Sequence, residues 1–199
     1  MLLLIRIFSL LPLSVLYFLA DWVIYPLVRY VARYRLKIVR KNIRMSFPEK
    51  TEKEQNAIIN AFYHHFADIL VEIIYGYRMS DEEMRERFVF ENVSMVEELA
   101  HKNKGVFFML GHYGNWEWVA DIGKRYTDPQ IKEYNVYRRL KNPSADKAML
   151  VLRQKRGGGG CIEKGQLLRR LVAMRHTSEL VTIGLISDQK PSPRNAHVW

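Results

Sequence analysis

An uninterrupted run of five bulky apolar residues, 106–110, stands between Gly105 and Gly111. A short apolar run between glycines predicts a buried strand. A second apolar run at 181–187 has the same character, and helix-like segments alternate with strand-like ones between the two. Because this alternation is typical of βαβ units, the sequence predicts an α/β fold with a mostly parallel sheet flanked by helices.

Capping boxes, apolar spacing and glycines place the other elements. The boxes pair Thr51 with Glu54, Ser80 with Glu83, and Ser94 with Glu97. We expect helices at 51–76, just after Ser80, and at 94–103, 115–125, 144–156 and 166–176. We expect strands at 88–90, 106–110, 131–137, 161–162 and 181–187, with 157–160 as a glycine connector.

The N-terminal region is apolar over 7–28, which is long enough to cross a bilayer core of about 30 Å. Pro12, Asp21 and Pro26 favour a broken or interfacial segment instead. A cleaved signal peptide is the alternative, but no small-residue cleavage site follows. We therefore predict a retained membrane-anchoring helix in a region spanning 1–45, followed by a second domain at 46–199.

Basic residues follow the apolar segment without a single acid between 29 and 44, and the whole chain carries a net charge of +10. An amphipathic basic helix beside an anchor suits anionic headgroups, with Arg29, Arg33, Arg40 and Lys41 as the expected membrane-binding residues. The positive-inside tendency predicts a cytoplasmic domain. A solvated basic helix or a nucleic-acid arm would share this composition, but no RNA-binding or recognition-helix pattern supports nucleic acid as a partner.

The strongest chemical signal follows the strand at 106–110, in the order Gly111, His112, Tyr113, Gly114, Asn115, Trp116, Glu117. The strand delivers His112 to the end of the sheet where α/β folds bind ligands. We expect Glu117 to orient the imidazole as a general base. No serine or cysteine stands beside His112, so the base would activate a substrate hydroxyl. A satisfied core histidine remains the competing interpretation.

Other polar groups are weaker candidates. His64, His65, Asp68 and Glu72 share one helix, but a polar helix face explains them better than a metal site, and we predict no metal. Cys161 is the single cysteine, which excludes an intramolecular disulfide. Arg138 and Arg153 could hold substrate phosphates through their guanidinium forks, or belong to a solvated basic face.

Four ordered blocks resemble the lysophospholipid acyltransferase superfamily, and within it the lipid A late-acyltransferase branch. The first is the His-x4-Glu block from His112 to Glu117, and the last is Asp188-Gln189. The intermediate blocks are Tyr137-Arg138 with Asn142-Pro143 and Asp146, and Arg153 with Gly157. Arg139 departs from the pattern, since proline is common there. The family usually continues past the Asp-Gln block, so the resemblance implies a domain incomplete at its C-terminal end.

The resemblance implies transfer of a fatty acyl group from acyl carrier protein to a hydroxyl of a lipid A precursor or related glycolipid. His112 and Glu117 would be catalytic, and no cofactor would be needed. The expected substrate-binding residues are Arg138, Arg153, Asn115, Asp188 and Gln189. The expected location is the cytoplasmic face of the bacterial inner membrane. A lysophospholipid or glycerol-phosphate acyltransferase and an inactive membrane-binding fragment are the alternatives.

Overall fold

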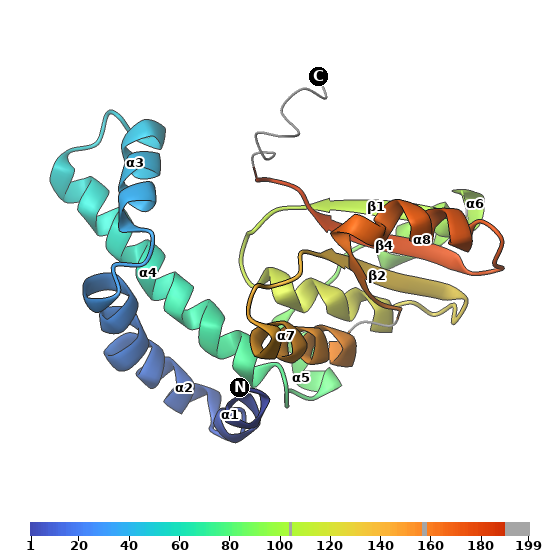
Figure 1. Ribbon diagram of the computed structural model, residues 1–199, viewed down its shortest axis with the longest axis horizontal. Coiled ribbons are helices and arrows are strands. Elements are labelled where there is room, and N and C mark those ends of the chain that lie inside the picture. The colour runs from blue at the N-terminus through green and yellow to red at the C-terminus, as the bar shows by residue number, and fades with distance from the viewer. Residues whose placement is uncertain (104, 157–158, 190–199) are drawn as a thin grey trace. The chain divides into compact units, whose positions relative to one another are not determined.

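The computed structural model describes residues 1–103, 105–156 and 159–189. The chain divides into two compact units, one formed by Leu3–Met79 and the other by Ser80–Trp199 with the first two residues. Figure 1 shows the helical first unit in blue to green and the sheet of the second in green to red. The units differ in architecture, so each is described by itself.

Helices make up the first unit. They are α1 (Leu2–Phe8), α2 (Leu13–Leu19), η1 (Ala20–Ile24), η2 (Leu27–Val31), α3 (Leu36–Ser46) and α4 (Glu52–Tyr75). The break in the N-terminal segment falls just before α2, where Pro12 is the N-cap. Further along, the chain stays helical past Asp21 and Pro26 because it widens into the two π-helical segments η1 and η2.

The helical segment Leu13–Val31 packs along α4 through both apolar and polar contacts. Leu13, Leu16 and Ala20 are buried against Ala67 and Val71. Three polar contacts accompany them: Tyr17 donates to Glu72 at 2.8 Å, Asp21 pairs with His64 at 2.8 Å, and Arg29 donates to Asn60 at 3.0 Å. As the residue numbers in these three contacts rise along the segment Leu13–Val31, those of their partners on α4 fall. The two helices therefore run antiparallel.

The basic region is not one continuous helix. Arg33 and Arg35 both adopt positive φ angles, 47° and 51°, and α3 starts only at Leu36. The Tyr34 ring between them stacks on Phe66 at 5.5 Å, and its carbonyl accepts a hydrogen bond from Tyr63. These contacts with α4 hold the chain in a turn at a place where periodicity alone predicts continued helix.

A parallel sheet forms the second unit, as predicted. Its strands are β1 (Gly105–Leu110), β2 (Ile131–Tyr137), β3 (Gly160–Glu163) and β4 (Leu180–Ile186), in the order β1-β4-β2-β3. The most separated apolar runs of the sequence, β1 and β4, are therefore neighbours, with Leu110 paired to Ile186. This pairing brings the C-terminal ends of β1 and β4 to the same edge.

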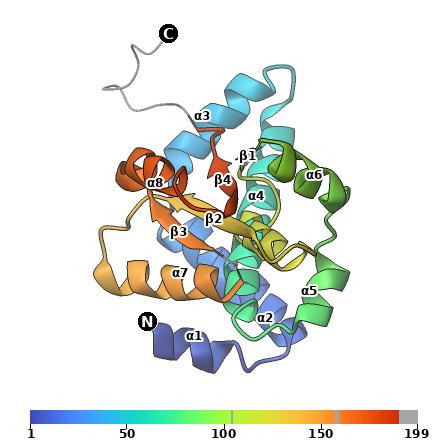
Figure 2. The same ribbon diagram turned by 90° about the vertical axis from the view of Figure 1, so that its right-hand side faces the viewer.

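Helices cover both faces of the sheet, with α8 (Leu167–Met174) and α7 (Pro143–Arg156) on opposite sides (Figure 2). The face under α8 is apolar, and Tyr134, Ile162, Val181 and Ile183 are buried there. The other face carries η3 (Trp116–Lys124) together with α7. The other elements are α5 (Asp81–Arg87), α6 (Val93–Asn103) and η4 (Lys164–Gln166).

Two local predictions are wrong. No strand forms at 88–90, where Phe88 packs instead against Phe90 and Trp118. Helix α6 begins at Val93, so Ser94 lies inside its first turn and does not cap it. The helix predicted at 115–125 does form, at Trp116–Lys124, with 3₁₀ geometry. In the first two cases aromatic packing and the left-handed Asn92 outweigh the local sequence pattern.

Candidate active site

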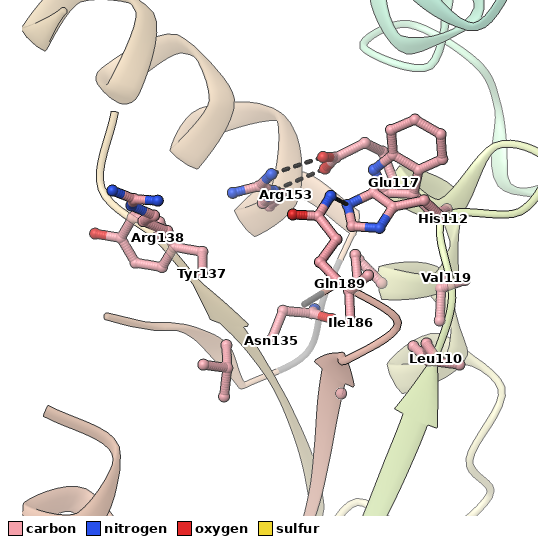
Figure 3. Close-up of a pocket in the computed structure, with 14 residues that line it drawn as sticks. Leu110, His112, Glu117, Val119, Asn135, Tyr137, Arg138, Arg153, Ile186 and Gln189 are labelled. Atoms are coloured by element: carbon pink, nitrogen blue, oxygen red, sulfur yellow. Dashed lines mark hydrogen bonds and ion pairs between the residues drawn. The ribbon is translucent and has the colours of Figure 1, made fainter. Parts of the chain in front are cut away.

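A pocket of about 280 Å³ opens at the C-terminal ends of the strands. Figure 3 shows side chains from β1, η3, β2, α7 and β4 around it. Apolar residues line part of the wall, among them Leu110, Val119 and Ile186, and polar groups line the rest. The polar residues are His112, Glu117, Asn135, Tyr137, Arg138, Arg153 and Gln189.

His112 is held by the end of the neighbouring strand. Its Nδ1 lies 2.7 Å from Asp188 Oδ1, and its backbone N–H donates to Asp188 Oδ2 at 2.8 Å. Hydrogen bonds from the backbone and then the side chain of His112 hold the pKa of Asp188 below its usual range. Because an ionised carboxylate accepts only, this contact favours the neutral tautomer that has its proton on Nδ1 and its lone pair on Nε2.

The other ring nitrogen of His112 belongs to the pocket side. Gln189 lies beside it, with the amide nitrogen 3.4 Å from His112 Nε2 (Figure 3). The Trp116 ring meets the imidazole edge-on, with centroids 5.0 Å apart. Asp188 thus orients the ring through Nδ1, and Nε2 lies on the pocket side beside Gln189.

Glu117 does not take the orienting position that its spacing from His112 predicts. Its two carboxylate oxygens accept hydrogen bonds from Arg153 at 2.7 and 2.6 Å. Burial opposes the charge of Arg153, but the hydrogen bond and charge of Glu117 more than offset it and raise the arginine pKa. A half-buried guanidinium requires a carboxylate, and α7 brings Arg153 to Glu117. The carboxylate that contacts and orients His112 is that of Asp188.

The predicted substrate-binding residues separate into two groups. Arg138, Arg153 and Gln189 line the pocket. Asp188 and Asn115 do not line it, and Asp188 instead contacts Nδ1 of His112. Asn115 stands at the start of η3 with only 7% of its surface exposed. Asn115 is therefore a buried residue of the His-x4-Glu block and does not face the pocket.

Sequence reasoning missed several pocket residues. Asn135 and Gly184 face each other across β2 and β4, and Ile186 and Trp116 complete the wall. Their only sequence signal is a position near the C-terminal end of a predicted strand or just after one. Which strands are neighbours decides whether such residues meet, and local sequence patterns do not reveal the order of the strands in the sheet.

The expected membrane-binding bases also divide. Arg33, Arg40 and Lys41 are exposed, but Arg29 is buried under the rings of Tyr30 and Tyr63, with 8% of its surface exposed. Arg29 is therefore unavailable to headgroups in this structure. Two helices, Leu13–Val31 and Glu52–Tyr75, are long and apolar enough to cross a membrane by length and composition alone.

Two members of the cluster on α4, His64 and Glu72, make contacts within their own unit. His64 pairs with Asp21 and stacks on Tyr25, with ring centroids 3.6 Å apart. Within residues 1–103, 105–156 and 159–189, no three histidine, cysteine or acidic side chains come together in an arrangement suited to a metal ion.

The fold and site together define an α/β protein with a histidine, oriented by a carboxylate, at the carboxyl edge of a parallel sheet. The chain matches the bacterial lipid A biosynthesis acyltransferase family over residues 1–198, and it belongs to that family. It is also similar to lipid A biosynthesis acyltransferase 2 of Shigella flexneri, with 27% identity over 145 residues. That match covers 69% of this chain and 44% of the relative, so the chain spans less than half of the relative's length.

Proposed function

We propose that the protein transfers a fatty acyl group from the thioester of acyl carrier protein to a hydroxyl group of a lipid A precursor. The observation that carries this proposal is His112, which is oriented through Nδ1 by Asp188 and has Nε2 at the pocket. Membership of the lipid A acyltransferase family supports the acceptor class. The strongly basic chain suits both an acidic carrier protein and an anionic membrane.

In the proposed reaction His112 Nε2 accepts the proton of the acceptor hydroxyl as its oxygen attacks the thioester carbonyl carbon. The tetrahedral intermediate then collapses, the carbon–sulfur bond breaks, and the imidazolium returns the proton to the thiolate. Asp188 stabilises the positive charge that His112 carries between these steps. Such a base contributes about 10²- to 10⁴-fold to a rate.

Two arginines define the charge of the pocket. Glu117 neutralises the charge of Arg153, and this ion pair links the 3₁₀ helix η3 to α7 at the side of the pocket. Arg138 follows β2 on the pocket's rim beside Tyr137 (Figure 3). Arg138 is therefore the residue we assign to a phosphate of the acceptor, because a guanidinium fork binds phosphate oxygens in pairs.

We further propose that the first unit holds the protein at the cytoplasmic face of the inner membrane. Large apolar side chains of the segment Leu13–Val31 are exposed to solvent: Val15, Phe18, Trp22, Val23, Leu27, Tyr30 and Val31. Helix α3 adds Lys37, Arg40, Lys41 and Arg44, all exposed. An apolar surface followed by a basic helix suits an anionic bilayer.

The test is acyl transfer from acyl carrier protein to a lipid A precursor by the purified chain in detergent or vesicles. Replacement His112→Ala should reduce the rate at least 10²-fold, whereas His176→Ala, which removes an exposed histidine, should leave it unchanged. Equal activity of both variants would contradict the role of His112. Transfer to a lysophospholipid but not to the lipid A precursor would replace the proposed acceptor. Vesicle binding without transfer would indicate a membrane-binding module.

A further inference from the structure

A buried acidic residue stands next to the pocket on the same strand. The pocket opens at the C-terminal ends of the strands, and of its β2 and β4 residues Asn135 and Gly184 lie farthest from those ends. These two residues are paired in register. Glu133 comes two residues before Asn135, so both side chains point to the same face of the sheet. Only 1% of Glu133 is exposed. The two residues therefore form a polar column that leads from the pocket into the interior.

Gly184 leaves the space in which the Asn135 amide lies. A Cβ atom on residue 184 would stand 3.0 Å from Asn135 Oδ1 and 3.8 Å from Leu110 Cδ1. Side chains rarely tolerate the first distance, so the missing side chain at 184 defines where the amide sits. Figure 3 shows Asn135 reaching from β2 into the pocket, below Gln189 in this view.

Burial favours the neutral form of Glu133. Burial raises its pKa to about 8, and the nearby side chain of Asn135 offsets part of that rise. The titratable groups on which the charge of Glu133 acts are Tyr126, near the end of η3, and Cys161 on β3. Burial raises their pKa values to about 12 and about 11, so both are uncharged where Glu133 titrates. A neutral carboxyl group can both donate and accept a hydrogen bond.

Both members of the column have an unsatisfied polar atom. Glu133 Oε2 and Asn135 Nδ2 are buried without a hydrogen-bonding partner among the described residues. A hydrocarbon chain placed against such atoms would leave them unpaired, and this is costly in a buried site. A ligand group that can donate or accept would be favoured there.

We propose that the deep end of the pocket receives a hydrogen-bonding group of a substrate and not the hydrocarbon end of the acyl chain. Asn135 contacts this group, and Glu133 is a positioning residue that acts through Asn135. The inference rests on the proposed acyl transfer. An amide or hydroxyl of the acceptor sugar and an amide of the thioester donor share this chemistry, and kinetics can separate them.

The first experiment varies each substrate with Asn135→Ala and Asn135→Leu. We expect KM to rise about 10-fold for one substrate, with kcat changed less, which corresponds to the loss of one or two hydrogen bonds. A rise for the lipid A precursor assigns the group to the acceptor, and a rise for the acyl carrier protein assigns it to the donor. The preferred acyl length should stay the same. A shift of that preference, or unchanged KM values, would overturn the proposal.

The second experiment tests Glu133 with Glu133→Gln and, as a matched control, Glu98→Gln on the exposed side of α6. Infrared difference spectra of the wild type should show a protonated carboxyl band that disappears near pH 8. Glu133→Gln should lack the band, and Glu98→Gln should keep it. The KM that Asn135 governs should rise above pH 8 in the wild type but not in Glu133→Gln. A missing band, or the same pH profile in both, would overturn the role of Glu133.

Failure of the proposed function gives a different pattern. A wild-type chain that transfers no acyl group to any tested hydroxyl contradicts acyl transfer, and with it the assignment of Asn135 to a substrate. The infrared band requires no substrate, so it reports on the buried carboxyl independently. Active wild type with silent Asn135 variants overturns only the inference drawn here.

Discussion

Asp188 Oδ1 lies 2.7 Å from His112 Nδ1, and its second oxygen accepts the backbone N–H of the same histidine. The two residues are 76 positions apart in the chain, yet each comes just after the C-terminal end of a strand, β1 or β4. The double contact fixes the ring, its tautomer and the position of its backbone. The imidazole is therefore already oriented as a general base before a substrate binds.

Replacement Asp188→Asn should reduce kcat by about 10²- to 10⁴-fold without unfolding the protein, because an amide can stabilise the wrong tautomer of His112. Steady-state kinetics and circular dichroism would measure the two effects. A matched control is Asp128→Asn, which alters another histidine–aspartate pair, with His101 at 3.0 Å. Loss of activity in the control, or none in Asp188→Asn, would count against the assignment.

The Glu117–Arg153 pair should behave as a structural ion pair. Replacement Arg153→Met leaves Glu117 in a mostly buried site and should cost about 3 kcal/mol of unfolding free energy. The exchange Glu117→Arg with Arg153→Glu should recover part of that loss, and chemical denaturation would show it. A base-orienting role for Glu117 predicts a different result: Glu117→Gln would shift the pH–rate profile of His112 while leaving stability nearly unchanged.

Glu133 should make the folded state less stable as pH rises. Its carboxyl ionises near pH 4.5 in the unfolded chain but near pH 8 in the folded one, so the unfolded state gains a charge first. Stability is greatest below pH 4.5 as far as this group is concerned, and it falls until about pH 8. Glu133→Gln should therefore stabilise the protein at pH 7 by up to about 3 kcal/mol. Thermal melts at pH 5 and 8 should show a larger gain at pH 8.

Helix α3 should contribute electrostatic membrane affinity. The double replacement of Arg40 and Lys41 by Gln should weaken binding to anionic vesicles by about 2 kcal/mol and leave binding to neutral vesicles unchanged. Flotation assays at two salt concentrations would measure this. The control replaces Arg169 and Arg170, two exposed bases of α8, and removes the same charge. Equal losses in both variants would indicate a non-specific charge effect.

Arg29 should respond differently from the exposed bases. Its guanidinium donates to Asn60 and lies 5.2 and 5.3 Å from the ring centroids of Tyr30 and Tyr63. Arg29→Gln should therefore lower the melting temperature, because a buried side chain loses its packing and its hydrogen bond. Vesicle binding of the folded variant should change less than in the Arg40 and Lys41 double variant.

Sequence reasoning identified elements whose pattern is local and long. The apolar runs of β1 and β4, the helix opened by Thr51 and the position of His112 after a strand all follow from neighbours within a few residues. It was less successful where distant contacts outweigh the pattern. The segment 88–90 has strand composition but packs its aromatic rings on Trp118, and the basic stretch after Arg29 is broken by the packing of Tyr34 on Phe66.

The sequence alone determined which residue types stand at the ends of the strands, because alternation of apolar and turn-forming segments is written locally. Which of these residues meet depends on how the chain folds. The order β1-β4-β2-β3 makes the first and last strands neighbours, so that His112 contacts Asp188. Glu117 pairs with Arg153 instead. Spacing along the chain cannot report this choice, since strand order depends on how the helices pack across the sheet.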